Sequence, residues 1–134
     1  HAGLTFCNLS HAFFTACDTP LLTPEVIRTL MRDGRPEDDV IVPVVGGYYE
    51  PLCAVYSTKC LPVIESILHS GRAKISAMYA QMQVRTVPEE QILEADPDLD
   101  SFINVNTPQD LALVQEHFAS KREAGRGSQA AGDP

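Results

Sequence analysis

The chain has 134 residues, of which 44% are hydrophobic and 21% are charged, and these values are typical of one globular domain with a buried core. Its formal net charge of −8 argues against non-specific nucleic-acid binding, because neutralising phosphates requires a basic surface. No apolar run approaches the roughly 18 residues of a transmembrane helix, so we expect no membrane partner and take the cytoplasm as the default compartment. The four cysteines and four histidines lack the paired spacing of zinc ligands.

The first half of the chain alternates between helical and extended patterns. Residues 2–8 are predicted to end a helix, residues 11–17 to form a buried strand and residues 24–32 to form an amphipathic helix. Residues 40–45 are rich in valine and isoleucine and predict a second strand. Because Pro43 within this run costs a ladder hydrogen bond, we expect the second strand to lie at a sheet edge or to end early.

The alternation continues in the second half. Residues 52–56 predict a strand, residues 59–69 a helix, residues 75–82 a short helix and residues 84–87 a short strand. The acidic stretch 88–100 is predicted to be a solvated loop, because it lacks the glycine and the closing glutamate of a calcium-binding loop.

A closing helix and a polar tail end the chain. The helix has an apolar face that should pack on the sheet, formed by Leu111, Leu113, Val114 and Phe118. Residues 120–134 lack the apolar side chains needed to fold, so we expect a disordered tail there and a domain that covers residues 1–119.

Asp18 is the residue at which the sequence points most directly to chemistry. It follows the predicted strand over residues 11–17, and open α/β sheets bind ligands just outside the carboxyl ends of such strands. A single carboxylate there can hold a Mg²⁺ whose other ligands are waters and nucleotide phosphates. The alternative is a turn residue whose side chain bonds its own backbone, because Asp before Thr-Pro is common in turns.

Three segments of the chain carry a family resemblance. They are Asp18-Thr-Pro-Leu-Leu, Pro51-Leu-Cys-Ala-Val-Tyr and Phe102-Ile-Asn-Val-Asn-Thr-Pro-Gln-Asp-Leu. In this order and at this spacing they resemble the molybdenum cofactor guanylyltransferases, and the resemblance covers nearly all of residues 1–119. The glycine-rich phosphate-binding loop and lysine of that family lie before this region. We therefore expect the chain to be the carboxy-terminal portion of a longer enzyme, without the first phosphate-binding unit.

The resemblance implies a fold and a reaction. The fold is a three-layer α/β nucleotidyltransferase fold of the Rossmann-like type with a mostly parallel sheet. The reaction is Mg²⁺-dependent transfer of GMP from GTP to the terminal phosphate of molybdopterin, with release of pyrophosphate. GTP and molybdopterin are then the expected partners, and molybdoenzymes or their chaperones are expected to receive the product. Without the first phosphate-binding unit, this chain alone is expected to be inactive.

Two alternatives stay open at this point. One is the sister reaction that transfers CMP from CTP to the same pterin, because base choice in the family depends mainly on the amino-terminal half. The other is a non-catalytic cofactor-binding or docking domain fused to another maturation protein.

Within the resemblance, Asp18 is the expected catalytic and metal-binding residue, and Asn104 and Asn106 are the expected substrate-side residues. Residues 102–105 predict a short strand that carries the first amide. Amide side chains offer donors and acceptors without charge, which suits a pterin or a phosphate near a metal. The alternative is that the two asparagines only satisfy the backbone of a turn before a helix cap at Thr107.

Three further residues are expected at the substrate. Tyr49 follows two glycines and could stack on the pterin ring, or it could cover a hairpin. Arg72 and Lys74 follow a predicted helix end, where they could contact phosphates or only favour the helix dipole.

Overall fold

The computed structural model describes residues 1–32, 34–71 and 74–130, with side chains up to residue 121. Its helices are α1 (Ala2–Thr5), α2 (Pro24–Arg32), α3 (Leu61–His69), α4 (Glu89–Ala95) and α5 (Pro108–Ala130), and its strands are β1 (His11–Thr15), β2 (Val40–Val45), β3 (Tyr48–Tyr49), β4 (Cys53–Ser57) and β5 (Val84–Val87). Short 3-10 helices are η1 (Thr58–Cys60), η2 (Ile75–Gln81) and η3 (Asp100–Phe102). Most of the predicted helices and strands are therefore confirmed.

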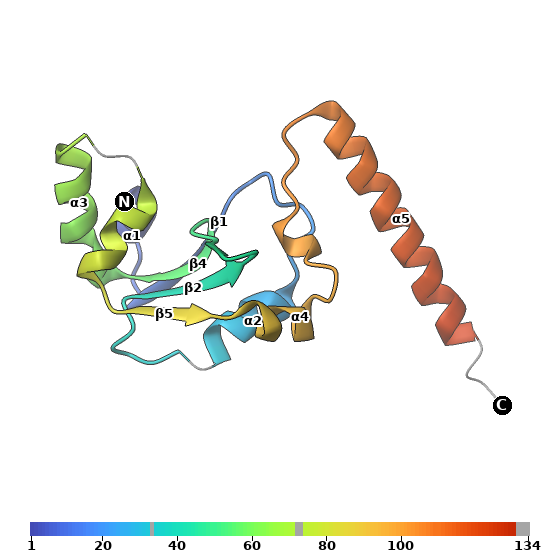
Figure 1. Ribbon diagram of the computed structural model, residues 1–134, viewed down its shortest axis with the longest axis horizontal. Helices are drawn as coiled ribbons and strands as arrows, with labels where there is room; N and C mark the ends of the chain where they lie inside the picture. Colours follow the sequence, from blue (N-terminus) through green and yellow to red (C-terminus); the bar gives the residue numbers. More distant parts are fainter. Residues whose placement is uncertain (33, 72–73, 131–134) are drawn as a thin grey trace.

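The five strands form one mixed sheet. Its order is β1-β4-β2, with β3 and β5 both pairing with β2. β4 runs antiparallel to β1 and to β2, whereas β5 runs parallel to β2. The predicted mostly parallel sheet is therefore wrong. β1, β2 and β5 nevertheless point in one direction, so their carboxyl ends share one edge of the sheet (Figure 1).

Strand β2 lies inside the sheet, although its proline predicts an edge or an early end. It pairs with β4 only through Val40 and Ile41, and with β3 only from Val44 onwards. Pro43 therefore occupies the position between these two ladders, where no backbone N–H is needed. Its carbonyl accepts a hydrogen bond from the Glu50 amide at 3.0 Å, and its parallel partner on the other side is in β5. A proline is tolerated in an interior strand because the pairing partner changes at that residue.

The hairpin between β2 and β3 turns through two glycines. Gly46 and Gly47 have positive φ angles of 58° and 82°, which is the backbone that a two-residue hairpin with a native twist requires. The turn places Tyr48 opposite Val45 and Tyr49 opposite Val44. A Gly-Gly pair between two β-rich runs is thus the local reason for the hairpin.

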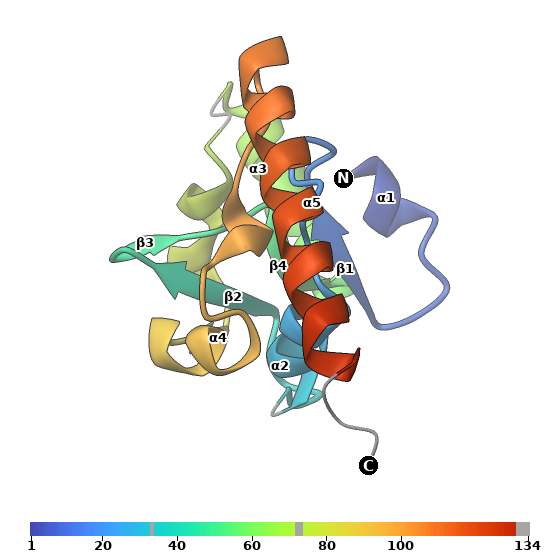
Figure 2. The ribbon, with the colours of Figure 1, turned by 90° about the vertical axis from the view of Figure 1, so that its right-hand side faces the viewer.

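Helices cover both faces of the sheet (Figure 1, Figure 2). On one face, α1, α3 and η2 enclose a core whose buried members are Leu4, Val40, Val42, Ala54, Tyr56, Cys60 and Met78. On the other face, α2 and α4 enclose a second core, formed by Val26, Leu30, Ile41, Cys53, Val55, Val87 and Ile92. The alternation of side chains along β2 and β4 supplies both cores, and the result is the three-layer arrangement that the family resemblance implies.

The acidic stretch after β5 is more ordered than a solvated loop. Residues Glu89–Ala95 form α4, which starts after Pro88 with two acidic residues in its first turn and buries Ile92 completely. Asp96 and Asp100 are only 5% and 8% exposed, because their carboxylates accept hydrogen bonds from protein donors. The solvated-loop prediction is therefore wrong for these residues.

One prediction near the end of the chain also differs from the structure. Residues 103–106 have no regular secondary structure, so the predicted strand over residues 102–105 is wrong, and η3 occupies its start. Helix α5 extends to Ala130, and the division into a domain over residues 1–119 and a tail stays a prediction. No proline interrupts this stretch, and Lys121 forms ion pairs with Asp98 and Asp100.

Helix α5 does not bury the apolar face predicted for it. Leu111 and Leu113 are 45% and 66% exposed, and Val114 is the buried apolar residue of the part of α5 whose side chains are described. The helix stands beside the edge of the sheet rather than on one of its faces (Figure 1).

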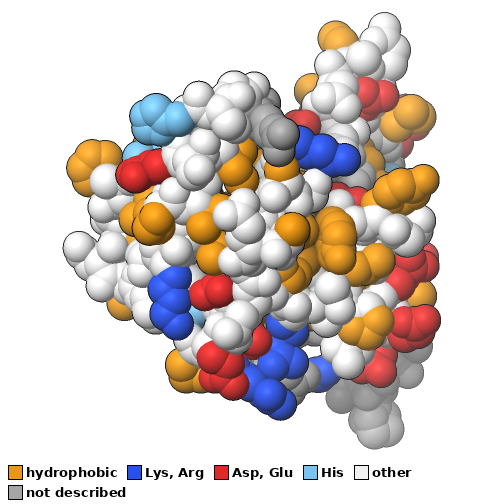
Figure 3. Space-filling model, turned by 60° about the vertical axis from the view of Figure 1, so that its left-hand side comes forward, with side chains coloured by type: hydrophobic (Ala, Val, Ile, Leu, Met, Phe, Trp, Pro, Cys, Tyr) orange, Lys and Arg blue, Asp and Glu red, His pale blue; other side chains and the backbone are white. Residues whose placement is uncertain are grey.

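The surface agrees with the acidic composition. On the face drawn in Figure 3, Lys and Arg side chains form small separate groups rather than one basic surface. None of the helices over the described residues is long and apolar enough to cross a bilayer.

Candidate functional site

Asp18 lies three residues beyond the carboxyl end of β1, on the ligand-facing edge that the sequence predicts. Its residue is half-buried, and its Oδ1 atom is fully buried with no hydrogen-bond partner in the described structure. A buried carboxylate oxygen without a donor costs free energy unless a ligand supplies the missing partner. The turn interpretation, in which the Asp18 side chain bonds local amides, accounts for none of this geometry.

Residues 16–19 form a loop, called the Asp18 loop below. Neighbouring residues hold this loop in place without binding the Asp18 carboxylate. The Ala16 amide donates to the Leu52 carbonyl at 3.0 Å, which fastens the start of the loop to the turn before β4. The Thr19 hydroxyl donates to the Ala16 carbonyl at 3.1 Å and lies 3.2 Å from the Thr15 hydroxyl. The loop conformation is thus fixed by hydroxyl and backbone groups, and the acidic side chain is left available.

The structure brings the two predicted site segments together. The Val105 amide, between Asn104 and Asn106, donates to the Asp18 carbonyl at 2.8 Å. Both asparagines are exposed, so their amide side chains are accessible from solvent beside the Asp18 loop. Val105 and Asp18, 87 positions apart in the chain, therefore meet through a backbone hydrogen bond that local sequence patterns do not reveal.

The start of α5 orients residues 104–106, called the asparagine segment below. The Asp110 carboxylate accepts hydrogen bonds from the amides of Asn106 and Thr107 at 3.0 and 2.9 Å, and the Thr107 hydroxyl accepts one from the Asp110 amide at 3.1 Å. This reciprocal arrangement is a capping box. These bonds hold the pKa of Asp110 below its ordinary value, with the Asn106 amide as the largest cause. The predicted cap role of Thr107 is confirmed.

A second contact between the same two chain regions went unpredicted. The Thr23 amide, at the start of α2, donates to the hydroxyl of the fully buried Ser101 at 3.2 Å. Asp96 in turn accepts hydrogen bonds from the amides of Asp100 and Ser101 at 3.2 and 2.8 Å. The signal that could have identified this turn is the position of Asp96 and Ser101 next to apolar residues that pack on the core.

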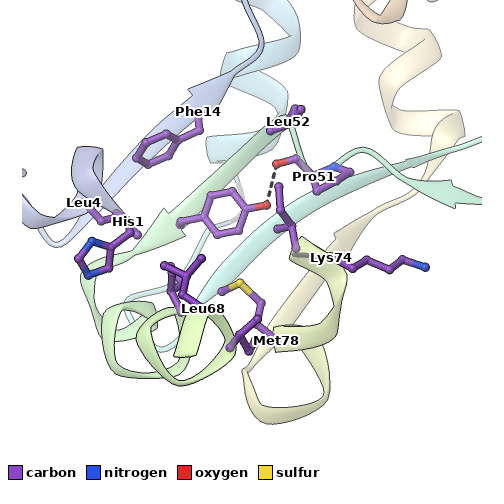
Figure 4. Close-up of a pocket in the computed structure, with 12 residues that line it drawn as sticks. His1, Leu4, Phe14, Pro51, Leu52, Leu68, Lys74 and Met78 are labelled. Atoms are coloured by element: carbon purple, nitrogen blue, oxygen red, sulfur yellow. Dashed lines mark hydrogen bonds between the residues drawn. The ribbon is translucent and has the colours of Figure 1, made fainter. Parts of the chain in front are cut away.

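The described residues line cavities near the sheet. One has a volume of about 480 Å³ at the carboxyl ends of β2 and β5, along the same edge as Asp18, and Gly47, Thr86 and Glu90 are among its lining residues. Another has a volume of about 250 Å³ and is mainly apolar. It lies between α1, α3 and η2, with Leu4 and Met78 in its wall (Figure 4). Tyr56 and Pro51 both line this second cavity, and the Tyr56 hydroxyl donates a hydrogen bond to the Pro51 carbonyl.

The remaining predicted site residues lie elsewhere. Lys74 lines the apolar cavity, and its side chain points away from His1 and Leu4 (Figure 4). Tyr49 is 46% exposed and packs edge-on against Tyr79, with ring centroids 5.2 Å apart. No described contact joins either residue to the Asp18 loop, and Arg72 lies outside the described residues.

The cysteines are not arranged for metal chemistry. Burial raises the pKa of Cys53 to about 12 and the pKa of Cys60 to about 11, so both remain neutral thiols. Within the described ranges, no three His, Cys, Asp or Glu side chains gather as a metal site. Asp18 therefore suits a cation that takes one protein carboxylate and completes its shell with water and phosphate oxygens, as Mg²⁺ does.

Residues 1–87 match the family model of the MobA-like NTP transferase domain. The chain belongs to this family. It is 48% identical over 122 residues to a protein of Desulfosudis oleivorans named molybdenum cofactor guanylyltransferase, covering 91% of this chain and 60% of that protein. It is 36% identical over 121 residues to a probable molybdenum cofactor guanylyltransferase of Methanosarcina mazei, covering 90% and 54%.

A solved structure supports the same assignment. The molybdopterin-guanine dinucleotide biosynthesis protein A of Archaeoglobus fulgidus superposes with a TM-score of 0.71 at 30% identity, over 82% of this chain and 56% of that one. The predicted family resemblance is thus confirmed. The chain spans just over half of the length of these relatives.

Proposed function

We propose that this chain contributes to the transfer of GMP from GTP to the terminal phosphate of molybdopterin, which yields the guanine dinucleotide form of the cofactor and pyrophosphate. A substrate phosphate oxygen would attack the α-phosphorus of GTP, and the bond from that phosphorus to the leaving pyrophosphate would break. The observation that carries the proposal is the buried Oδ1 of Asp18 at the carboxyl edge of the sheet, which has no hydrogen-bond partner among the described residues. The names of the relatives favour GTP over CTP.

Asp18 is the proposed holder of the Mg²⁺. A bound divalent cation neutralises charge on the phosphoryl oxygens. The chain's own contribution is to present one carboxylate from a loop that is fixed on both sides, by Leu52 and by Val105. Fixed placement matters because phosphoryl transfer depends mainly on positioning and on preorganised charge.

Asn104 and Asn106 are the proposed substrate-side residues. They are exposed, they flank the amide that bonds the Asp18 carbonyl, and the capping box at Asp110 fixes the Asn106 amide. Their amides can donate to a phosphate or accept from the pterin without adding charge. The cavity of about 480 Å³ lies along the same edge, so an extended substrate bound at Asp18 has room in that direction.

Tyr49, Arg72 and Lys74 remain proposed substrate contacts with less support. Tyr49 is exposed enough to meet a planar ring, and Lys74 presents an exposed ammonium. Their roles depend on how a substrate extends from the Asp18 edge.

The test is guanylyl transfer by the complete enzyme with Asp18→Ala. We expect a loss of at least about a hundredfold in turnover, the size found when a preorganised charge-stabilising group is removed. Glu94→Gln, which changes an exposed carboxylate of α4, is the matched control and should leave turnover unchanged. Near-normal turnover of Asp18→Ala would refute the assignment. Competition between GTP and CTP in the same assay separates guanylyl from cytidylyl transfer.

A further inference from the structure

Asp100 is a buried carboxylate just before the asparagine segment. Its side chain is 11% exposed and meets a histidine and a lysine from one face of α5. His117 Nε2 lies 3.0 and 2.9 Å from the two carboxylate oxygens, and Lys121 donates to Oδ2. Burial alone would raise the pKa of Asp100, but hydrogen bonds from Lys121 and His117 outweigh it and hold the pKa below its ordinary value.

These polar contacts join the middle of α5 to the turn that ends in η3. His117 and Lys121 are one helical turn apart and reach the same carboxylate, and Lys121 also pairs with Asp98 at 2.6 Å. The neighbouring apolar residue Leu113 remains largely exposed. Figure 2 shows α5 running past the edge of the sheet. The ion pairs from Lys121 join the helix to Asp98 and to Asp100 of η3.

The backbone beside Asp100 is held in a strained state. Leu99 has a φ angle of 55°, in the left-handed region that non-glycine residues rarely adopt. Such a conformation persists only where surrounding contacts determine it, and here the Asp96 carboxylate binds the next two amides. The turn from residue 96 to residue 101 therefore has one defined conformation.

The asparagine segment is thus enclosed between two fixed ends. Asp100 precedes it, and the α5 residues that pair with Asp100 follow it. In its middle, the Val105 amide bonds the Asp18 carbonyl. Asp100 itself touches neither Asn104 nor Asp18 in any described contact, so any effect on them must pass through the segment.

We infer that Asp100, with His117 and Lys121, is a positioning residue that holds the Asn104–Asn106 segment against the Asp18 loop. The effect on the segment stands on the contacts alone, whereas its consequence for substrate binding rests on the proposed function. Asp96, Asp98 and Asp100 therefore hold the turn and α5 in place through hydrogen bonds and ion pairs, and they do not form a cation site.

The first test is hydrogen exchange of this chain without substrate. Lys121→Met removes the ammonium and keeps the length of the side chain. We expect the Val105 amide to exchange about tenfold faster, the effect of losing one charge-assisted hydrogen bond on a local opening. Amides of β4 should be unchanged. Lys121→Arg keeps the charge and should restore slow exchange at Val105. Arg28→Met, which breaks an exposed pair with Glu25 on α2, is the control and should leave Val105 unaffected.

Two results would overturn the inference. One is unchanged exchange at Val105 in Lys121→Met. The other is equal acceleration at Val105 and in β4, because the cluster would then support the whole fold rather than the segment. Neither result depends on guanylyl transfer, so failure of the proposed function would leave this test intact.

The second test is kinetic and uses the complete enzyme. Lys121→Met should raise the KM for molybdopterin about tenfold while the KM for GTP stays unchanged, since only the asparagine segment is loosened. Lys121→Arg should bring the KM for molybdopterin back. A fall in kcat with both KM values unchanged would contradict a positioning role toward that substrate.

Discussion

Asp38 and Asp18 lie at opposite edges of the sheet and differ in their hydrogen bonding. Asp38 precedes β2 at the amino edge, is 7% exposed, and accepts hydrogen bonds from the Arg85 side chain and the Arg35 amide at 2.5 and 2.8 Å. Asp18 follows β1 at the carboxyl edge, and its buried Oδ1 has no partner among the described residues. A carboxylate that stabilises a fold is partnered, so an unpartnered one at the ligand-facing edge is better explained by a ligand.

The largest expected effect concerns the partnered aspartate. Asp38→Asn should lower the free energy of unfolding by about 3 kcal/mol, because it removes the charge of a buried carboxylate that accepts hydrogen bonds from the Arg85 side chain and the Arg35 amide. Urea denaturation measures the change. Glu25→Gln, in an exposed pair with Arg28, is the control and should give no measurable change. Equal stability of the parent and Asp38→Asn would remove the contrast between the two edges.

A smaller loss is expected at the turn that supports the asparagine segment. Asp96→Ala removes the acceptor of two buried amides, and we expect a loss of about 2 kcal/mol in the free energy of unfolding. Differential scanning calorimetry would show a lower melting temperature. If the melting temperature is retained, the left-handed backbone of Leu99 is not held by this carboxylate.

Lowering the pH should gradually reduce the contribution of Asp38 to the free energy of unfolding. Burial alone would raise the pKa of Asp38, but hydrogen bonds from Arg85 and Arg35 outweigh it and hold the pKa below its ordinary value. A carboxyl whose pKa is lower in the folded state contributes stability above its unfolded pKa of about 3.9, and that contribution is lost as the pH falls toward the folded value. Urea midpoints between pH 7 and pH 3 should fall more steeply below pH 4 in the parent than in Asp38→Asn. Parallel curves would show that Asp38 is not linked to folding in this way.

Much of the fold follows from local patterns. The two glycines and flanking valines specify the β2–β3 hairpin, and Thr23 and Pro24 specify the start of α2. Strand direction does not follow, because the residues of β4 read the same in a parallel or an antiparallel pair. The interior position of β2 also escapes prediction, since Pro43 is acceptable only because two different partners flank it.

The candidate site divides in a similar way. Asp18 and the two asparagines can be found from their positions after a strand and before a helix cap. Their meeting cannot, because it depends on one backbone hydrogen bond from Val105 across the fold. The ion-pair role of Asp100 cannot be predicted from local sequence either, because its partners His117 and Lys121 lie well beyond it in the chain, on α5.

The most direct test of the central claim is the free energy of unfolding of Asp18→Asn, measured without divalent cations beside the parent chain. We expect the substitution to leave stability unchanged or to raise it slightly, because the buried Oδ1 accepts no hydrogen bond from the described residues that the substitution could break. A loss comparable to that of Asp38→Asn would show that the Asp18 carboxylate is already used by the fold, and would contradict its reservation for a ligand.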